Sequence, residues 1–436
     1  MPTTRVLAAR LIVLGLLVMV VSPAAAQRLL FTYAPAADAN VSVTQSIDLG
    51  AGVVEWTEFD RMIVTPVFTA DGEYAVFRRS FTGPATPPLV VRHVRSGAEL
   101  LVATDFVPWI AHPTDAAVFG LVAIQSDGMR TTGSVARLDG GGLHVGGGCP
   151  PRNTMSLDLS ADGTALVTLC QSGEVHVLDA ATGQSVRTLP PDPTNTVRSV
   201  RFARGTSQLL VVRTDAAAMA HVALVDASTG GTDASTMPAV PAGAFCRLAA
   251  MTPDRSTALV TCTHATTIPF SIIGWATIID VGSLGFGPAL PVNLPGEAVF
   301  SADGREVFMT SRHRLGFGQL TRYDATSGSI LQSSGTLFPG FFGVAFPPLA
   351  PTLTAAVTGS AVDLSWTVPS HSPLATTFTL EVGSAPGLTD LATFALGPTP
   401  AVSVPGAPAG RYYVRVRGVN ATGTGAASAE LVVDVP

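Results

Sequence analysis

The sequence contains no lysine, so all 25 of its basic residues are arginine. This excludes phosphate-binding loops built around a lysine, Schiff-base catalysis and a lysine general base. Charged residues are scarce, at 13% of the chain, and aromatic residues make up only 7%. Neither a run of like charge nor a basic amphipathic stretch occurs, so binding to nucleic acid or to a membrane surface has no electrostatic basis.

Motifs of catalysis and metal binding are also missing. The sequence lacks GxSxG, HExxH, a GxGxxG that follows a strand, and the DxDxDG calcium loop. The eight histidines are scattered, and no CxxC spacing suggests a metal. We therefore expect no cofactor and no metal, and the absences favour a protein that is not an enzyme.

What the sequence does have is apolar surface and turns. Hydrophobic residues account for 47% of the chain, and there are 43 glycines and 33 prolines. A disordered chain has too little apolar surface to bury, so this composition predicts a globular protein of short, turn-rich segments.

The N-terminus has the pattern of a secretory signal. Arg5 and Arg10 precede an apolar run over residues 11–21, and small residues follow up to Ala26. The run is too short to span a membrane, which takes about 20 apolar residues. We expect residues 1–26 to be a signal peptide cleaved after Ala26, with an uncleaved anchor as the alternative. The mature protein is then expected to be a monomer without a membrane span, secreted or periplasmic and possibly at the cell surface.

Four cysteines in an exported protein allow three disulfide pairings. Cys246 and Cys262 flank the turn at Asp254 symmetrically, which places them opposite each other in an antiparallel hairpin. Cys149 and Cys170 also bracket a turn, at residues 161–163. The sequence therefore predicts two structural disulfides, Cys149–Cys170 and Cys246–Cys262.

One phrase recurs along the chain: an apolar residue, two small or polar residues, Asp-Gly or a substitute, then an apolar strand. Its first residues are 68, 110, 159, 202, 251, 300 and, in a truncated copy, 346. A second turn of the form Asp-x-x-x-Gly follows in three copies, at Asp179, Asp226 and Asp324. A period of 40–50 residues with strand-like content predicts propeller blades of about four strands each. We interpret the aspartates as turn residues, because Asp accepts backbone N–H bonds two residues on.

The two ends of this region complement each other. The mature N-terminus offers three strands without an anchor, near residues 28–33, 41–47 and 53–56, and the last anchor ends at Phe346 without a hairpin partner. Together they make one blade, which closes the ring and removes exposed edges. We therefore predict seven blades over residues 27–346. The repeated Phe-Ser-Ala-Asp-Gly and Leu-Asp-Ala-Ala-Thr-Gly phrases resemble the YVTN family of bacterial propellers, related to WD40-like propellers. The resemblance implies the fold and says little about function.

At Pro347 and Pro348 the repeat ends, and seven short segments with alternating apolar and polar residues follow within residues 347–436. This predicts a Greek-key sandwich. The segment resembles a fibronectin type III domain, in which Trp366 would be the core tryptophan of the second strand and Tyr412 the corner tyrosine. Such domains mostly serve as spacers or adhesive modules. The overall expectation is an all-β chain: a seven-bladed β-propeller plus a C-terminal fibronectin type III β-sandwich.

Two groups of residues are candidates for ligand binding on one propeller face. Guanidinium groups after the second strand of several blades suit a carboxylate or sulfate ligand, with solvated hairpin ends as the alternative. These candidates are Arg78, Arg79, Arg213, His264, Arg312, His313 and Arg314. The second group sits where strands enter the ring, where Trp beside a carboxylate can stack on sugars, with core packing as the alternative. It comprises Glu55, Trp56, Glu58 and Trp109.

The sequence thus favours an exported binding or interaction protein with no catalytic residues, whose propeller binds a ligand, a protein or a glycan and whose C-terminal domain is a spacer. The alternative is a propeller enzyme, a hydrolase of glycans or lactones with carboxylates at the channel mouth. A third interpretation is a structural cell-surface protein without a small-molecule site.

Overall fold

The computed structural model describes residues 28–34, 43–48, 53–58, 66–78, 89–102, 104–115, 117–126, 131–150, 153–203, 205–265, 272–312, 318–333 and 338–436. These residues form strands joined by turns, and the fold is all-β. Over this part of the chain, no helix has the length and apolarity needed to cross a membrane. The expected signal peptide, residues 1–26, lies outside the described residues.

Antiparallel sheets with four strands in sequence order make up most of the N-terminal region. The first contains β4 (Val67–Phe68), β5 (Tyr74–Arg78), β6 (Leu89–His93) and β7 (Glu99–Val102). Three further sheets follow the same order along the chain: β16 (Asn195–Phe202), β17 (Gln208–Asp215), β18 (Ala220–Asp226) and β19 (Thr232–Thr236); β20 (Phe245–Met251), β21 (Thr257–Ala265), β22 (Ile272–Asp280) and β23 (Phe286–Leu290); β24 (Pro295–Phe300), β25 (Glu306–Arg312), β26 (Gly318–Asp324) and β27 (Ile330–Ser333).

Eight strands form a larger sheet, which consists of two such groups joined by one residue pair, Gly133 with Thr154. Its strands are β8 (Val107–Ala111), β9 (Val118–Ser126), β10 (Thr131–Asp139), β11 (Gly142–Val145), β12 (Thr154–Leu159), β13 (Ala165–Cys170), β14 (Val175–Asp179) and β15 (Ser185–Leu189).

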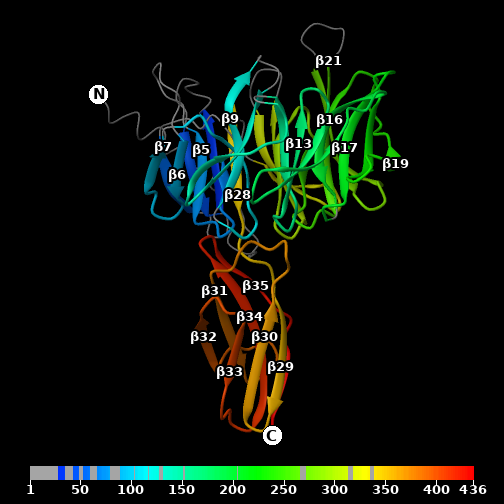
Figure 1. Cartoon of the computed structure of the whole chain (residues 1–436). Coiled ribbons are helices and arrows are strands. Elements are labelled where there is room, and N and C mark those ends of the chain that lie inside the picture. Colours follow the sequence, from blue (N-terminus) through cyan, green and yellow to red (C-terminus); the bar gives the residue numbers. More distant parts are fainter. Residues whose placement is uncertain are drawn as a thin grey trace, which may run out of the picture.

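One sheet combines the two ends of this region, in the order β28-β1-β2-β3. Its strands are β28 (Phe338–Ala345), β1 (Arg28–Ala34), β2 (Val43–Asp48) and β3 (Val53–Glu58). The antiparallel pairing of β1 with β28 ties the N-terminal strands to the strand that precedes the C-terminal region. The first strands of successive sheets are also in contact: β4 with β8, then β12, β16, β20, β24 and β28, and β28 again with β4. Repeated sheets that contact one another in this way form a β-propeller, the upper body in Figure 1.

The core of this body lies between neighbouring sheets. One apolar cluster joins Val167 of β13 to Phe202 of β16 and Val211 of β17, and another joins Val212 of β17 to Leu248 of β20. Each fully buried side chain of this kind stabilises the fold by about 1.5–3 kcal/mol. Packing between neighbouring sheets therefore helps to hold the ring together.

The recurring turn phrase has one local structure. In the turn between β12 and β13, the Ser160 hydroxyl donates to Asp162 at 2.6 Å, and the same carboxylate accepts the Thr164 N–H at 3.1 Å. Asp71, Asp254 and Asp303 accept the same two kinds of bond in their turns. These aspartates stabilise hairpins, as the sequence predicts.

Both predicted disulfides are present, Cys149–Cys170 and Cys246–Cys262. Cys246 and Cys262 are directly paired across β20 and β21, with their Cα atoms 4.0 Å apart. The symmetric spacing of the two cysteines about the Asp254 turn is therefore a reliable guide to their pairing.

The C-terminal residues form two sheets around one apolar core, the lower body in Figure 1. One sheet contains β29 (Thr352–Thr358), β30 (Ala361–Thr367) and β33 (Ala401–Val404), and the other contains β31 (Thr377–Gly383), β32 (Ala392–Leu396), β34 (Gly410–Asn420), β35 (Gly423–Ala427) and β36 (Leu431–Val435). Trp366 is buried in this core, edge-on to Phe378, and Val414 and Val416 face inward. The Tyr412 hydroxyl donates to the carbonyl of Pro408 at 2.9 Å.

The two bodies meet at the turn between β4 and β5. The N–H of Leu374 donates to the carbonyl of Ala70 at 3.0 Å, and the N–H of Ala421 donates to the carbonyl of Asp71 at 3.2 Å. Arg95 adds a bond from Nε to the carbonyl of Ala421 at 2.6 Å. Thr422 is fully buried in this contact. The C-terminal sheets therefore contact the propeller on the side that carries the turns between first and second strands, and they cover the turn between β4 and β5.

Candidate ligand-binding cavity

A cavity of about 440 Å³ lies among the first strands β8, β12, β16 and β20. Loops at residues 171–173 and 191–192 also border it. In antiparallel sheets these loops lie at the opposite strand ends from the turns that meet the C-terminal sheets, so the cavity belongs to the other half of the propeller. Its wall consists of Trp109, Met155, Ser156, Gln171, Ser172, Gly173, Pro191, Asp192, Asn195, Thr196, Val197, Arg198, Ser199, Arg201, Phe245, Arg247 and Leu248.

Two arginines of the cavity wall lie on neighbouring first strands, β16 and β20. Arg198 and Arg247 each precede the last residue of their strand, Phe202 or Met251, by four positions. The register of β16 with β17 shifts between Val197 and Ser199, so Arg198 is the extra residue of a β-bulge. Bulges re-aim side chains and are common beside functional sites.

Neighbouring groups hold both guanidinium groups in place. Arg198 lies over the ring of Phe245, 5.7 Å from its centroid, and its Nε donates to the hydroxyl of Thr214 at 3.3 Å. Arg247 donates from Nη2 to the carbonyl of Gly296 at 3.3 Å, while its side chain remains 43% exposed. An arginine that is already oriented loses less freedom when it binds a ligand.

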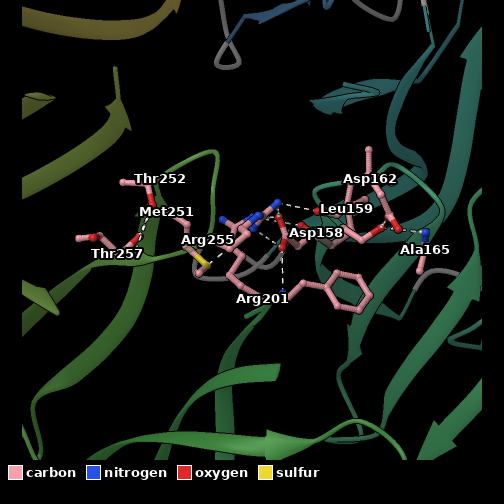
Figure 2. Close-up of polar contacts among 12 residues, drawn as sticks. Asp158, Leu159, Asp162, Ala165, Arg201, Met251, Thr252, Arg255 and Thr257 are labelled. Atoms are coloured by element: carbon pink, nitrogen blue, oxygen red, sulfur yellow. Dashed lines mark hydrogen bonds and ion pairs between the residues drawn. The ribbon is translucent and has the colours of Figure 1, made fainter. Parts of the chain in front are cut away.

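A buried ion network lies behind the inner end of the cavity (Figure 2). Asp158 of β12 is 1% exposed and accepts bonds from one neighbouring strand, β16, and from a distant turn. Arg201 donates from Nη1 to Asp158 Oδ1 and to the carbonyl of Leu157, both at 3.3 Å. The N–H of Phe202 donates to Asp158 Oδ2 at 3.0 Å.

Arg255 completes this network from the turn between β20 and β21. Its Nη1 donates to Asp158 Oδ2 at 2.7 Å, and its Nη2 donates to Oδ1 at 3.3 Å and to the carbonyl of Leu159 at 2.5 Å. Arg255 has a φ of 61°, whereas the corresponding positions of two other turns are Gly163 and Gly304, at 75° and 72°. A left-handed non-glycine residue is strained, by about 1–3 kcal/mol. The bidentate contact with a buried carboxylate offsets that strain.

Asp192 is a carboxylate at the cavity edge. It accepts bonds from the Thr194 hydroxyl at 2.7 Å, from Asn195 Nδ2 at 2.8 Å and from Arg213 Nη1 at 3.2 Å. Burial alone would raise the pKa of Asp192, but the hydrogen bonds from Thr194 and Asn195 outweigh it, so the pKa is lowered. Asp192 is therefore ionised at neutral pH and orients its neighbours.

Positive charge is in excess around the cavity. Arginine side chains line it or lie directly behind its wall at positions 198, 201, 213, 247 and 255, against the carboxylates Asp158, Asp192 and Glu297. The whole chain carries a net charge of −6. A positive concave site in an acidic protein attracts and orients small anions.

Two candidates from the sequence lie at or behind the cavity wall. Trp109 lines the cavity and packs against the apolar cluster that contains Phe119 and Leu157. Arg213 lies behind the wall, bonded to Asp192 and to the hydroxyl of Thr232 at 3.2 Å.

Arg78 and His264 lie away from the cavity wall. The guanidinium group of Arg78 is buried and donates to the carbonyls of Asp105 at 3.1 Å and Thr104 at 3.4 Å. Burial lowers the pKa of Arg78, and the nearby charge of Asp105 opposes that shift. His264 Nδ1 is buried without a hydrogen-bond partner among the described residues. The contacts of Arg78 anchor the loop that precedes β8.

The remaining candidates cannot be brought into this geometry. Arg79, His313 and Arg314 lie outside the described residues. Only the backbone is described for the last four, Glu55, Trp56, Glu58 and Arg312.

Sequence reasoning missed the residues that dominate the wall: Arg198, Arg201, Arg247 and Phe245. A signal for them exists, because the first strand of each blade faces the channel and should be apolar or small. Arginines within Val197–Phe202 break that rule, and Arg247 breaks it in the next strand.

A group of potential metal ligands lies nearby but does not form a metal site. Cys170, Glu174 and His176 have their ligand atoms within 4.8 Å of one another. The sulfur of Cys170 is bonded to Cys149, so only two of these groups can bind an ion.

No family model and no curated protein matches the sequence. Among solved structures, the chain is similar to the β-propeller domain of Cps50 (Swd1) from Myceliophteria thermophila, with a TM-score of 0.44 and 11% identity over 62% of this chain and 89% of that one. It is also similar to the Dos1 propeller, with a TM-score of 0.43 and 14% identity over 70% of this chain and 83% of that one.

Proposed function

We propose that this protein is a non-enzymatic binding protein that recognises an anionic group in the propeller cavity. The observation that carries the proposal is the pair of oriented arginines, Arg198 and Arg247, which line the same cavity from the neighbouring strands β16 and β20. A pair of forked guanidinium groups matches the planar geometry of a carboxylate.

The carboxylates near the cavity support binding rather than hydrolysis. Asp158 is bonded to two arginines and to a backbone N–H, and Asp192 is ionised and bonded to three side chains. A general acid must hold a proton near neutral pH, and a general base must be able to reach its substrate. Asp158 is buried outside the cavity wall and does not reach a substrate, and Asp192, with its lowered pKa, is not a general acid at neutral pH.

The proposal includes a specific architecture. We take the propeller to have seven blades over residues 27–346, closed by the pairing of β1 with β28. Residues 347–436 form a fibronectin type III domain, supported by the buried Trp366 and by the bond from Tyr412 to the carbonyl of Pro408. This domain acts as a spacer, and the protein is exported through its N-terminal signal. The two disulfides are compatible with an oxidising compartment.

A thermal-shift screen tests this function. The mature protein is melted with sulfate, acetate, citrate, neutral sugars and divalent cations. A ligand at about 100 times its Kd stabilises the fold by about 2.7 kcal/mol. We expect shifts with carboxylates that are lost in R198Q/R247Q and kept in R305Q, whose side chain is 83% exposed on a turn between first and second strands. The proposal is contradicted if no anion shifts the melting curve, or if the shifts in R198Q/R247Q equal those in R305Q.

A further inference from the structure

We infer that the cavity binds an acidic sugar, a hexuronate unit that carries a carboxylate and several hydroxyl groups. This inference rests on the proposed anion-binding function and names the chemical class of its ligand. It follows from three kinds of groups that share one cavity wall: guanidinium groups, amide and hydroxyl side chains, and an indole ring.

The guanidinium groups supply the charge. Arg198 and Arg247 come from the adjacent strands β16 and β20, and Phe245 holds Arg198 from below through its ring. Arg201 lines the inner end, where its charge is shared with Asp158. A carboxylate placed between Arg198 and Arg247 would be attracted by both guanidinium groups, and the ion network behind them would stay in place.

The polar part of the wall matches a ligand rich in hydroxyl groups. Gln171, Asn195 and Thr196 line one side of the cavity. On β12, Ser156 also lines the cavity, and its hydroxyl is buried without a hydrogen-bond partner among the described residues. An unpartnered buried hydroxyl costs free energy, about 1–3 kcal/mol, unless a ligand or water pairs with it. A simple organic acid or sulfate would satisfy the arginines and leave these groups unused.

Trp109 provides the apolar surface that a sugar ring needs. It lies at a register shift of β8, between Pro108 and Ile110, and its indole is fixed by packing against the cluster around Leu157. A rigid aromatic face at a cavity wall binds the C–H face of a ring at little entropic cost. The cavity volume of about 440 Å³ lies within the range of small-molecule sites, about 300–1,000 Å³. It admits the end of a glycan and excludes a folded domain.

Isothermal titration calorimetry on the mature full chain tests the inference. The probes are galacturonate, glucuronate and their short oligomers, with galactose and glucose as neutral matches. Acetate, sulfate and triglutamate are anions without a sugar ring. We expect a uronate to bind at least about tenfold more tightly than its neutral hexose and than acetate, since a charge-assisted hydrogen bond is worth a tenfold change or more.

Three variants separate the contributions. R247Q should weaken uronate binding about tenfold or more, while R305Q leaves it unchanged. T196V removes a cavity hydroxyl and keeps the side-chain shape, so it should weaken uronate binding and leave acetate binding unchanged. Because Thr196 is exposed, this variant is expected to melt like the parent protein.

The outcomes distinguish this inference from the function on which it rests. If acetate, sulfate or triglutamate binds as tightly as the uronates, the sugar assignment is wrong and anion binding stands. If the neutral hexoses bind as tightly, the role of the arginines is wrong. If the wild-type protein binds none of the anions, both the inference and the proposed function fail.

Discussion

Replacing Arg255 by glycine should lower the stability of the wild-type protein and raise the stability of the D158N variant. In the wild-type protein, R255G removes one partner of a buried ion network, which typically costs about 3–5 kcal/mol. It also releases the left-handed strain at this residue, whose φ is 61°. Asp158 keeps Arg201 and the Phe202 N–H as partners, so the lower end of that range applies. The net destabilisation is then about 2 kcal/mol.

The size of the change makes it measurable by calorimetry. At roughly 2.1 cal/mol/K of unfolding entropy per residue, a propeller of about 320 residues loses about 3 °C in Tm for 2 kcal/mol. In the D158N background the carboxylate charge is already gone, and Arg255 is a buried guanidinium without its partner. There R255G removes both the strain and a buried charge whose remaining partner is the carbonyl of Leu159, so the Tm should rise.

A matched control isolates the strain. Ala218 has a φ of 60° in the turn between β17 and β18 and no guanidinium to lose. A218G should therefore raise the Tm slightly or leave it unchanged. If R255G lowers the Tm equally with Asp and with Asn at position 158, the contact between Arg255 and Asp158 does not stabilise the fold, and this reasoning is refuted.

Three further predictions follow from the structure. The C246S/C262S variant lacks the Cys246–Cys262 bridge, which spans 16 residues, and should be less stable by about 3 kcal/mol. Its Tm should be lower than that of the parent protein, and reductant should lower it by less than it lowers the parent's. Stability should fall as the pH drops from about 4 to about 2, because hydrogen bonds from Ser228 and the Thr229 N–H lower the pKa of Asp226 to about 2. A carboxyl group whose pKa is lower in the folded than in the unfolded protein stabilises the fold above the unfolded pKa, and this stability is lost on acidification. Melting curves in this range check the prediction, and an unchanged Tm contradicts it. G72A should loosen the contact with the C-terminal sheets, since a Cβ at residue 72 would lie 2.3 Å from Thr422 Cγ2. Limited proteolysis near residues 346–352 should then be faster. G359A is the control, because Gly359 also has a positive φ but nothing lies within 4 Å of its Cβ position, and it should leave the cleavage rate unchanged.

Local rules account for the parts of the fold that the sequence predicts. The Asp-Gly turns, the Cys246–Cys262 pair and the pairing of the first strand with the last one before Pro347 depend on hairpin geometry and on the repeat. In the C-terminal region, alternation in the strands places Trp366 and Val416 in the core. The sequence does not predict β35, because glycine and alanine dominate Gly423–Ala427.

The cavity depends on relations that no local pattern contains. Arg198 lines it because one extra residue in β16 forms a bulge, and the shift is visible only in the pairing with β17. Arg255 marks a departure from Asp-Gly in the sequence, yet its partner Asp158 is 97 residues away. The candidates Arg78 and Arg213 are expected after the second strands but lie within them, in β5 and β17, where carbonyls and Asp192 accept hydrogen bonds from their guanidinium groups.

The ion network of Asp158, Arg201 and Arg255 has a consequence for any polymer that the cavity accepts. These side chains fill the space behind the inner end, and the C-terminal sheets cover the turn between β4 and β5 on that same side. A polymer that enters the cavity as far as this network would enter by its terminus. The number of protein molecules bound by a polymer would then depend on how many chain ends it has, and would not increase with its length. Cutting one long chain into fragments would multiply the binding sites without adding any mass.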